Sequence, residues 1–184
     1  MSQTQIKTLK SKLSKPVVLI GMMGAGKSHI GSALAQSLDL RFFDSDREIE
    51  TKAGQSVADI FKSFGEKKFR DAERNTILEL MERGPCIIAT GGGAVMDDKT
   101  RESLLENAIV IWLDAPVETL WERVQKSKTR PLLHTDNPKQ RLNDLLEQRK
   151  PLYAQAHIRI AVSPRTAQEE VIKALYDFLN KDSV

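Results

Sequence analysis

Cysteine is almost absent from this sequence. The 184 residues include a single cysteine, Cys86, so the chain has no second thiol with which to form an internal disulfide. A protein without disulfides fits a reducing compartment, and we expect a cytoplasmic location. Because Cys86 stands in an apolar run, we interpret it as a buried structural thiol and not as a nucleophile.

Long hydrophobic runs are also missing. No stretch approaches the roughly 20 apolar residues of a membrane-spanning helix, so we expect no membrane partner. Residues 1–15 carry four lysines and no acid, but they lack the apolar segment of a secretory signal. We interpret residues 1–15 as a flexible basic arm and residues 16–184 as one domain. An apolar content of 40% and a charged content of 29% are ordinary for a globular protein.

Aromatic residues are few, and the charge is close to balanced. Aromatics make up 5% of the chain, and the net charge of +3 comes from bases that are interspersed with acids from residue 41 onward. This pattern favours a solvated mixed surface, because a nucleic-acid site would need an aromatic and basic platform. The three histidines are scattered and indicate no metal cluster. We expect a monomer with no nucleic-acid partner.

A strand, a glycine loop and a helix follow one another near the start of the chain. The apolar run Val17–Ile20 leads into residues 21–28, which spell G-x-x-x-x-G-K-S, and apolar residues then recur at helical spacing from Ile30. This is the pattern of a phosphate-binding P-loop. Its backbone N–H groups turn toward an anion, and the helix directs its positive end at the same point. Lys27 would reach the β- and γ-phosphates of a nucleoside triphosphate, and Ser28 would bind Mg²⁺.

Two carboxylates follow the next expected strand, residues 40–43. Asp44 and Asp46 would lie at the carboxyl end of that strand, where parallel α/β sheets open their ligand crevice. The placement favours metal and proton chemistry near the P-loop. The alternative is an acidic helix start, because aspartate is a good N-cap residue and suits the helix dipole. Both interpretations can hold together.

Three consecutive glycines, Gly91, Gly92 and Gly93, follow the apolar strand of residues 86–89. Glycines in that position bring bare backbone close to another group. A flexible turn is the alternative, but a turn at a sheet end rarely needs three glycines. We therefore expect a ligand contact here.

Arginines supply the other candidate site residues. Arg149 falls on the apolar stripe of the helix expected at residues 139–153, and a charge on an inward face should be paired or belong to a site. An arginine that snorkels at the helix end is the alternative. Arg70 lies three residues before Glu73, and this spacing alone favours a surface ion pair. The basic loop at residues 126–138 is either a lid or a solvated loop.

The alternation of strands and helices predicts a parallel sheet with helices on both faces. The candidate polar groups follow the strands and exceed what one nucleotide needs. A GTPase switch would also need an Asn-Lys-x-Asp motif after a core strand, and residues 180–182 do not fit that spacing. A phosphotransferase for a small polyhydroxylated acid uses the candidate groups better, because arginines can hold its carboxylate in bidentate fashion.

Six stretches together resemble the shikimate kinase family. They are residues 21–28, Asp44-Ser-Asp46, G-E-x-x-F-R-x-x-E at 65–73, Thr90-Gly-Gly-Gly93, Arg130-Pro-Leu132 and Arg149-x-x-x-Tyr153. The resemblance covers nearly all of residues 16–180, in order and with family-like spacing. It implies a three-layer α/β/α P-loop kinase fold with five parallel strands in the order 2-3-1-4-5. It also implies Mg²⁺-dependent transfer of the ATP γ-phosphate to the 3-hydroxyl of shikimate, giving shikimate 3-phosphate and ADP.

The resemblance implies a role for each candidate residue. A shikimate-binding segment would span about residues 44–75, and a mobile lid would span about residues 126–138. The catalytic residues would be Lys27, Asp46 and Arg130. The ATP-binding residues would be Gly24, Ala25, Gly26, Lys27, Ser28, His29, Arg123, Arg130 and Pro164. The shikimate-binding residues would be Asp46, Arg70, Gly91, Gly92, Gly93 and Arg149, and the Mg²⁺ ligands would be Ser28 and Asp44.

One position departs from the family pattern. His29 follows Ser28, where the family usually has a small hydroxyl residue that could contact a phosphate, so this chain lacks the hydroxyl for that contact. The nearest rival is a gluconate-type kinase, which shares the P-loop and a small acidic substrate. The stretch at residues 65–73 and the pair Asp44 and Asp46 favour shikimate.

Overall fold

Five parallel strands form the sheet at the centre of the protein. The computed structural model describes residues 2–125, 135–163 and 168–181. Within these residues the strand order is β2-β3-β1-β4-β5, which confirms the predicted fold and topology. The strands are β1 (Val17–Ile20), β2 (Phe42–Asp44), β3 (Ile87–Ala89), β4 (Ile109–Asp114) and β5 (Ile158–Ala161). In the central strand, Val17 pairs with Ile87 of β3 on one side and with Ile109 of β4 on the other.

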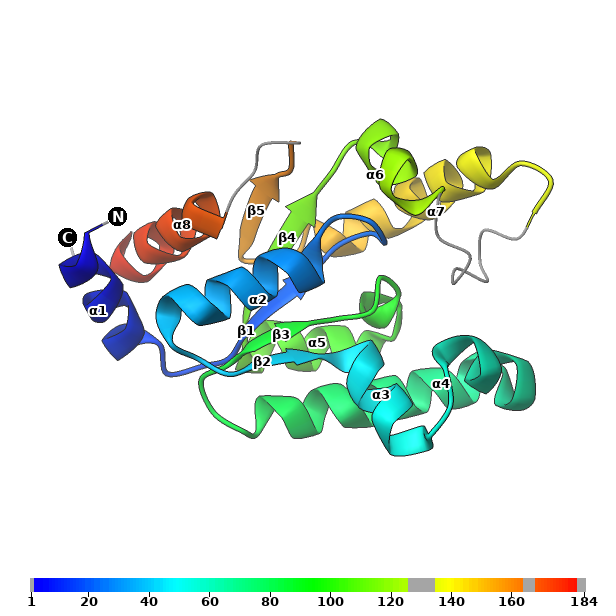
Figure 1. Cartoon of the computed structure of the whole chain (residues 1–184), viewed down its shortest axis with the longest axis horizontal. Coiled ribbons are helices and arrows are strands. Elements are labelled where there is room, and N and C mark those ends of the chain that lie inside the picture. Colours follow the sequence, from blue (N-terminus) through cyan, green and yellow to red (C-terminus); the bar gives the residue numbers. More distant parts are fainter. Residues whose placement is uncertain (1, 126–134, 164–167, 182–184) are drawn as a thin grey trace.

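Helices cover both faces of this sheet (Figure 1). They are α1 (Gln3–Lys12), α2 (Lys27–Leu38), α3 (Ser45–Ala53), α4 (Val57–Met81), the 3-10 helix η1 (Ala94–Met96), α5 (Asp98–Asn107), α6 (Val117–Val124), α7 (Pro138–Tyr153) and α8 (Gln168–Asn180). α2 packs against β1 and β3 and beside α8, whereas α5 packs against β4 and beside α4. β1 is buried along its whole length, as expected for a strand that is covered on both faces.

The single cysteine is buried in the core of the protein. Cys86 is fully buried immediately before β3, and burial raises the pKa of its thiol. A thiol in this state is a poor nucleophile, which agrees with the structural role predicted for Cys86.

No helix in the described part of the chain combines the length and apolarity needed to cross a membrane.

The first residues form a helix, so the prediction of a flexible arm is wrong for residues 3–12. α1 packs against α2 and α8. Leu9 is fully buried, Leu13 is 5% exposed and Ile6 packs against the same core. These apolar positions recur every three or four residues between the lysines. Their burial anchors the segment, although its basic charge suggested a flexible arm.

α4 is kinked at Gly65. Gly65 takes φ 77° and ψ 169°, which are not helical values, so two helical segments meet there, as expected from a glycine that ends one apolar stripe and precedes another. The kink turns the first part of α4 back toward α3, so that Phe61 lies 4.6 Å from Phe69 between ring centroids. Ile49, Ile60 and Phe69 form a small second core there.

Part of the expected lid and two predicted site residues lie outside the described residues. The expected lid at about residues 126–138 is described only from residue 135, just before α7 begins. Arg130 and Pro164 also lie outside the described residues. Their roles stay predictions.

Candidate active site

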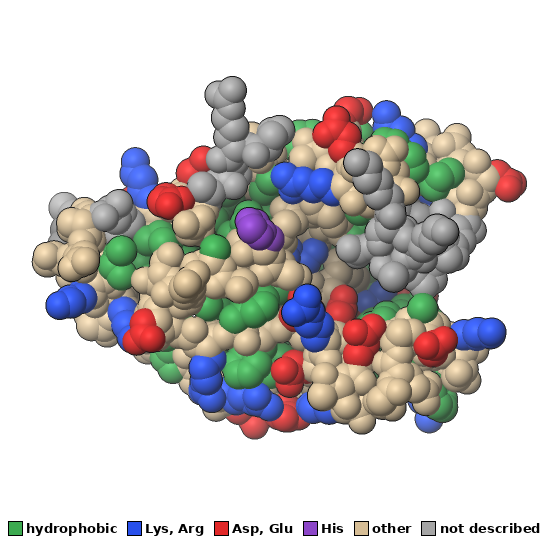
Figure 2. Space-filling view, in the orientation of Figure 1, with side chains coloured by type: hydrophobic (Ala, Val, Ile, Leu, Met, Phe, Trp, Pro, Cys, Tyr) green, Lys and Arg blue, Asp and Glu red, His purple; other side chains and the backbone are tan. Residues whose placement is uncertain are grey.

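The carboxyl ends of β1, β2 and β3 open into one cleft of about 730 Å³. Figure 2 shows the surface hollowed near the N-terminus of α2. Most of the site residues predicted from the sequence line this cleft, namely Gly24, Gly26, Lys27, Ser28, His29, Asp44, Asp46, Arg70, Gly91, Gly92, Gly93 and Arg149. The fold therefore brings together groups that come from five separate segments of the chain.

The P-loop joins β1 to α2 and presents its backbone to the cleft. Gly24 and Gly26 have φ values of 84° and 95°, which glycine adopts without strain. Lys27 begins α2 and is 8% exposed, and its Nζ donates to the carbonyl of Gly21 at 2.8 Å and to that of Met22 at 3.0 Å. A positive group at the N-terminus of a helix makes this loop a site for phosphate.

Ser28 and Asp44 face each other between the P-loop and β2. The Ser28 hydroxyl donates to Oδ2 of Asp44 at 2.6 Å. Oδ1 of Asp44 accepts the backbone N–H groups of Asp46 and Arg47 at 3.2 and 3.4 Å, so Asp44 also caps α3. The interpretation of Asp44 as a helix N-cap is thus confirmed, and its metal role stays a prediction. A hydroxyl beside a carboxylate is a donor set that suits Mg²⁺, and these residues fit the metal.

Asp46 and Glu73 converge on Gly91. A Cβ added at Gly91 would lie 2.7 Å from Oδ1 of Asp46 and 2.4 Å from Oε1 of Glu73. A side chain at this position would force one or both carboxylates to move, so glycine permits their close approach. The backbone N–H of Gly91 donates to the Ser45 hydroxyl at 3.2 Å, which ties the strand end to α3.

Arg70 forms an ion pair that faces the cleft and not the outer surface. Its Nη1 lies 2.6 Å from Oε2 of Glu73, and the side chains of Arg70 and Glu73 are 15% and 2% exposed. Nη2 of Arg70 lies 3.2 Å from the exposed Glu66. The interpretation of Arg70 and Glu73 as a surface pair is therefore wrong. A Cβ at Gly93 would come within 2.4 Å of the Arg70 guanidinium, so the glycine backbone makes room for this charge.

Glu73 is the site residue that the sequence interpretation missed. Burial raises the pKa of Glu73 to about 7; the Asp46 carboxylate adds to the rise, while the Arg70 and Arg149 guanidiniums oppose it. Oε1 of Glu73 is buried and has no hydrogen-bond partner among the described residues. The missed signal is its position four residues after Phe69 on the apolar stripe of α4. The same signal singled out Arg149, which is also buried and lines the cleft.

Arg149 projects from α7 into the same cleft and is 4% exposed. Its Nη1 donates to the carbonyl of Gly92 at 3.1 Å. Nε is buried without a hydrogen-bond partner among the described residues. The alternative that Arg149 snorkels to solvent is therefore wrong, and a buried guanidinium with unused donor capacity is suited to an anionic ligand.

The remaining nucleotide-side candidates surround the P-loop. Nη1 of Arg123, near the end of α6, donates to the carbonyl of Gly24 at 3.1 Å, so an exposed guanidinium lies over the loop. His29 is exposed in the first turn of α2 and lines the cleft. Ala25 is fully buried, so it lies behind the loop surface, where its backbone can contribute but its side chain cannot.

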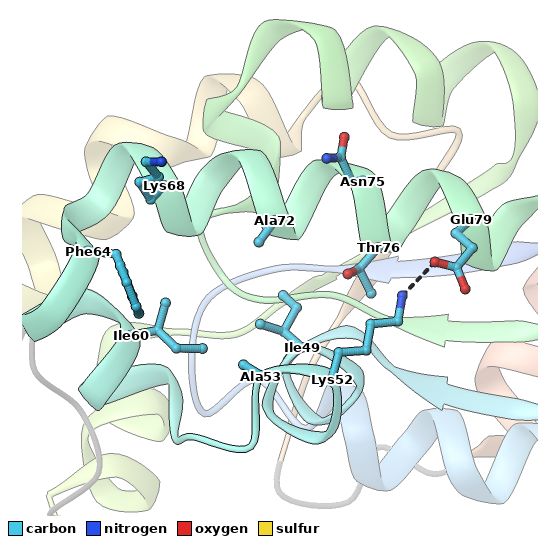
Figure 3. A pocket seen from close by; sticks show the side chains of 10 residues that line it. All are labelled: Ile49, Lys52, Ala53, Ile60, Phe64, Lys68, Ala72, Asn75, Thr76 and Glu79. Carbon is cyan, nitrogen blue, oxygen red and sulfur yellow. Dashed lines mark hydrogen bonds and ion pairs between the residues drawn. The ribbon is translucent and has the colours of Figure 1, made fainter.

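A second hollow of about 400 Å³ lies between α3 and α4 (Figure 3). Ile49 and Ala53 of α3 face Ile60, Phe64 and Ala72 of α4 across it. Its polar lining includes an ion pair in which Lys52 and Glu79 approach to 2.5 Å. Because apolar side chains dominate it and the converging charged groups lie in the larger cleft, we place the active site in the larger cleft.

The raised pKa of Glu73 predicts a measurable pH dependence of stability. The folded protein retains this proton up to about pH 7, whereas an unperturbed glutamate carboxyl, with a pKa of 4.5, releases it earlier. The stabilisation is therefore full below the unfolded pKa and is lost as pH rises toward 7. Between about pH 5 and about pH 8, the unfolding free energy of the wild type should therefore fall by on the order of 2 kcal/mol more than that of Glu73→Gln. Denaturant titrations across that range would measure it.

Glu79→Gln is the matched control for this measurement. Glu79 lies on the same helix, and hydrogen bonds from Lys52 and Arg83 lower its pKa. Its contribution to stability therefore changes only at lower pH, and the variant should follow the wild-type slope. Parallel wild-type and Glu73→Gln curves over this range would show that Glu73 is ionised in the folded protein throughout.

Comparison with known proteins identifies the family of this chain. A family profile described as shikimate kinase matches residues 23–180. The shikimate kinase of Cereibacter sphaeroides is 43% identical over 163 residues, which cover 89% of this chain and 82% of that protein. The shikimate kinase of Rhizobium meliloti is 42% identical, with 96% of this chain and 94% of that protein covered.

A solved structure extends the comparison to three dimensions. The shikimate kinase of Acinetobacter baumannii, determined in complex with shikimate, superposes with a TM-score of 0.87 and is 38% identical. The match covers 97% of this chain and 99% of that one. The chain described here belongs to the shikimate kinase family.

Proposed function

We propose that this protein transfers the γ-phosphoryl group of ATP to the 3-hydroxyl of shikimate, giving shikimate 3-phosphate and ADP on the pathway to chorismate and the aromatic amino acids. The observation that carries the proposal is a single cleft that contains a P-loop and two arginines, Arg70 and Arg149. The P-loop suits a nucleoside triphosphate. The arginines suit a carboxylate on a second, smaller substrate.

Arg70 and Arg149 would grip the shikimate carboxylate. Arg70 is held by Glu73, and Arg149 is held by the carbonyl of Gly92, so each guanidinium is fixed before substrate arrives. The backbone of Gly93 lies against Arg70 and would contact the same substrate. Preorganised donors of this kind cost little ordering free energy when the ligand binds.

Asp46 would hold the reacting hydroxyl. Its carboxylate lies against Gly91 and lines the cleft that also contains the P-loop and the two arginines. In the transfer, the 3-hydroxyl oxygen forms a bond to the γ-phosphorus, the bond from that phosphorus to the β–γ bridging oxygen breaks, and ADP leaves. Asp46 would accept the hydroxyl proton.

The phosphate side of the cleft would supply positive charge. Lys27 would stabilise the β- and γ-phosphate oxygens, and we propose the same for Arg130. Ser28 and Asp44 would hold Mg²⁺, which neutralises phosphate charge when bound. No group of three or more His, Cys, Asp or Glu side chains in the described part of the chain is arranged for a metal ion, so phosphate and water would complete the coordination.

The nucleotide base would lie on the outer side of the P-loop. Arg123 over Gly24 supports this position, and we propose that the turn at Pro164 lies against the adenine as well. His29 lines the cleft next to Ser28, where its imidazole replaces a smaller hydroxyl side chain. We further propose that residues 126–138 act as a lid that excludes water during transfer, because water would otherwise hydrolyse ATP.

Acceptor selectivity tests the proposed function. The rate of ADP release is measured with ATP and Mg²⁺ and with shikimate, gluconate, a nucleoside monophosphate or water as the acceptor. We expect shikimate, and none of the other acceptors, to give a rate well above that measured with water. A shikimate rate equal to that of water would contradict the proposal, and a faster reaction with gluconate would favour a gluconate-type kinase.

We also propose that the protein is a cytoplasmic monomer with no nucleic-acid or membrane partner.

A further inference from the structure

The carbonyl oxygen of Gly92 receives two hydrogen bonds from α7. Nη1 of Arg149 donates to it at 3.1 Å, and the hydroxyl of Tyr153 donates to it at 2.5 Å. Arg149 and Tyr153 are four residues apart and therefore lie on the same face of α7. One carbonyl thus ties the middle of the glycine triplet to two side chains of a distant helix.

Fixing this carbonyl also fixes the next backbone amide. The peptide between Gly92 and Gly93 is trans and planar, so the N–H of Gly93 points opposite to the Gly92 carbonyl and away from α7. No described residue accepts a hydrogen bond from that N–H. A glycine peptide is otherwise the most freely rotating kind, so its orientation depends on external contacts.

Tyr153 is well placed to provide such a contact. It is 1% exposed, and its ring stacks on Trp112 of β4 with centroids 5.9 Å apart. Burial raises the pKa of Tyr153 to about 12, so its hydroxyl keeps its proton at neutral pH and remains a donor. The ring is therefore immobilised by the core, and the hydroxyl points from the core to the glycine triplet.

The same ring lies where the triplet meets the P-loop. The hydroxyl of Tyr153 lies 3.9 Å from Sδ of Met22, the second P-loop residue. A Cβ at Gly92 would be 3.2 Å from the backbone nitrogen of Met23, so the two loops are in close contact. A shift of the triplet would therefore change the separation between the phosphate site and the second substrate.

We propose that Tyr153 is a positioning residue for the acceptor substrate, which orients the Gly92–Gly93 peptide and keeps Arg149 directed at the substrate carboxylate. This inference rests on the proposed function, since it assumes that the acceptor binds between Gly93, Arg70 and Arg149. Tyr153 does not itself touch the acceptor. Its effect should appear in the affinity for shikimate and not in the affinity for ATP.

Tyr153→Phe tests the inference, because phenylalanine retains the ring and removes the hydroxyl. We expect KM for shikimate to rise about tenfold, because the Gly92–Gly93 peptide and Arg149 lose their fixed orientation, while KM for ATP changes little. The melting temperature should fall by only a few degrees, as for the loss of one buried hydrogen bond. The other tyrosine of the chain supplies the matched control. Tyr176 lies on α8, distant from the cleft lining, and Tyr176→Phe should behave as wild type in both KM values.

The outcomes separate this inference from the proposed function. A wild-type protein that shows no shikimate-dependent ADP release would overturn both. An active wild type with an unchanged Tyr153→Phe variant would overturn the positioning role alone. Equal increases in KM for shikimate and for ATP, together with a lower melting temperature, would indicate a purely structural ring and would also overturn it.

A measurement on protein that retains Tyr153 tests the inference even if Tyr153→Phe does not fold. Labelling with 3-fluorotyrosine gives two fluorine signals, because the chain has two tyrosines. A labelled Tyr176→Phe sample assigns the signal of Tyr153. We expect shikimate to shift the Tyr153 signal and leave that of Tyr176 in place, whereas an unshifted Tyr153 signal at saturating shikimate would contradict the inference.

Discussion

Replacement of Asp46 by asparagine should lower kcat by about 10²- to 10⁴-fold, the usual range for removing a general base. The amide keeps the size of the side chain and can still contact the hydroxyl, but it cannot accept the proton as phosphorus–oxygen bond formation proceeds. Asp46 lies in the first turn of α3, and Asp44 remains to cap that helix. We therefore expect the fold to survive. ADP release at saturating ATP and shikimate measures the change in kcat.

A control variant separates chemistry from helix stability. Asp98 also lies in the first turn of a helix, α5, where its exposed carboxylate pairs with Arg101 at 2.7 Å. Asp98→Asn loses a comparable favourable interaction with a helix dipole but does not line the cleft, so its kcat should stay near that of wild type. Near-normal turnover of Asp46→Asn, with matching melting temperatures, would remove Asp46 from the mechanism.

Replacement of Arg149 by alanine should weaken shikimate binding by about 2–5 kcal/mol, which is a loss of roughly thirtyfold or more. The guanidinium is 4% exposed and its Nε has no hydrogen-bond partner among the described residues, so a substrate carboxylate would gain both charge and hydrogen bonds from it. Loss of the guanidinium also leaves the bound carboxylate facing a buried, unfilled space. ATP affinity should change little, because the P-loop supplies the phosphate contacts.

Isothermal titration with shikimate and, separately, with a non-hydrolysable ATP analogue measures the two affinities. Arg141→Ala on the same helix is the control, because Arg141 is exposed and lies two turns before Arg149. It should bind both ligands like wild type. Equal losses of both affinities in Arg149→Ala would show that the arginine stabilises the fold and does not grip the acceptor.

The arginines also show how far sequence reasoning reaches. Arg149 could be predicted as a site residue because it interrupts a run of leucines, and a charge on an inward face needs a partner. Arg70 could not be separated from a surface pair by its spacing to Glu73, because a spacing of three residues holds equally on buried and exposed helix faces. The resemblance to a family proposes Arg70 as a site residue, and the structure shows that its pair with Glu73 is buried and not on the surface.

The fold, too, could be predicted from the sequence only in part. The alternation of apolar strands and helices predicts a parallel sheet, but local periodicity carries no information about which strands are neighbours, and the order 2-3-1-4-5 came from the resemblance. The helix at residues 3–12 was missed because the segment carries three lysines, no acid and few apolar residues. Its stability depends on packing of Leu9 against distant helices, which composition does not report.

Identification of the product tests the central claim most directly. Purified protein is incubated with ATP, Mg²⁺ and shikimate, and the mixture is examined by phosphorus–proton correlation NMR. We predict a new phosphate monoester whose phosphorus couples to the ring proton at carbon 3, formed in equimolar amount with ADP. Phosphorus coupled to the proton of another ring carbon, or ADP formed without any phosphate ester of shikimate, would contradict the proposed reaction.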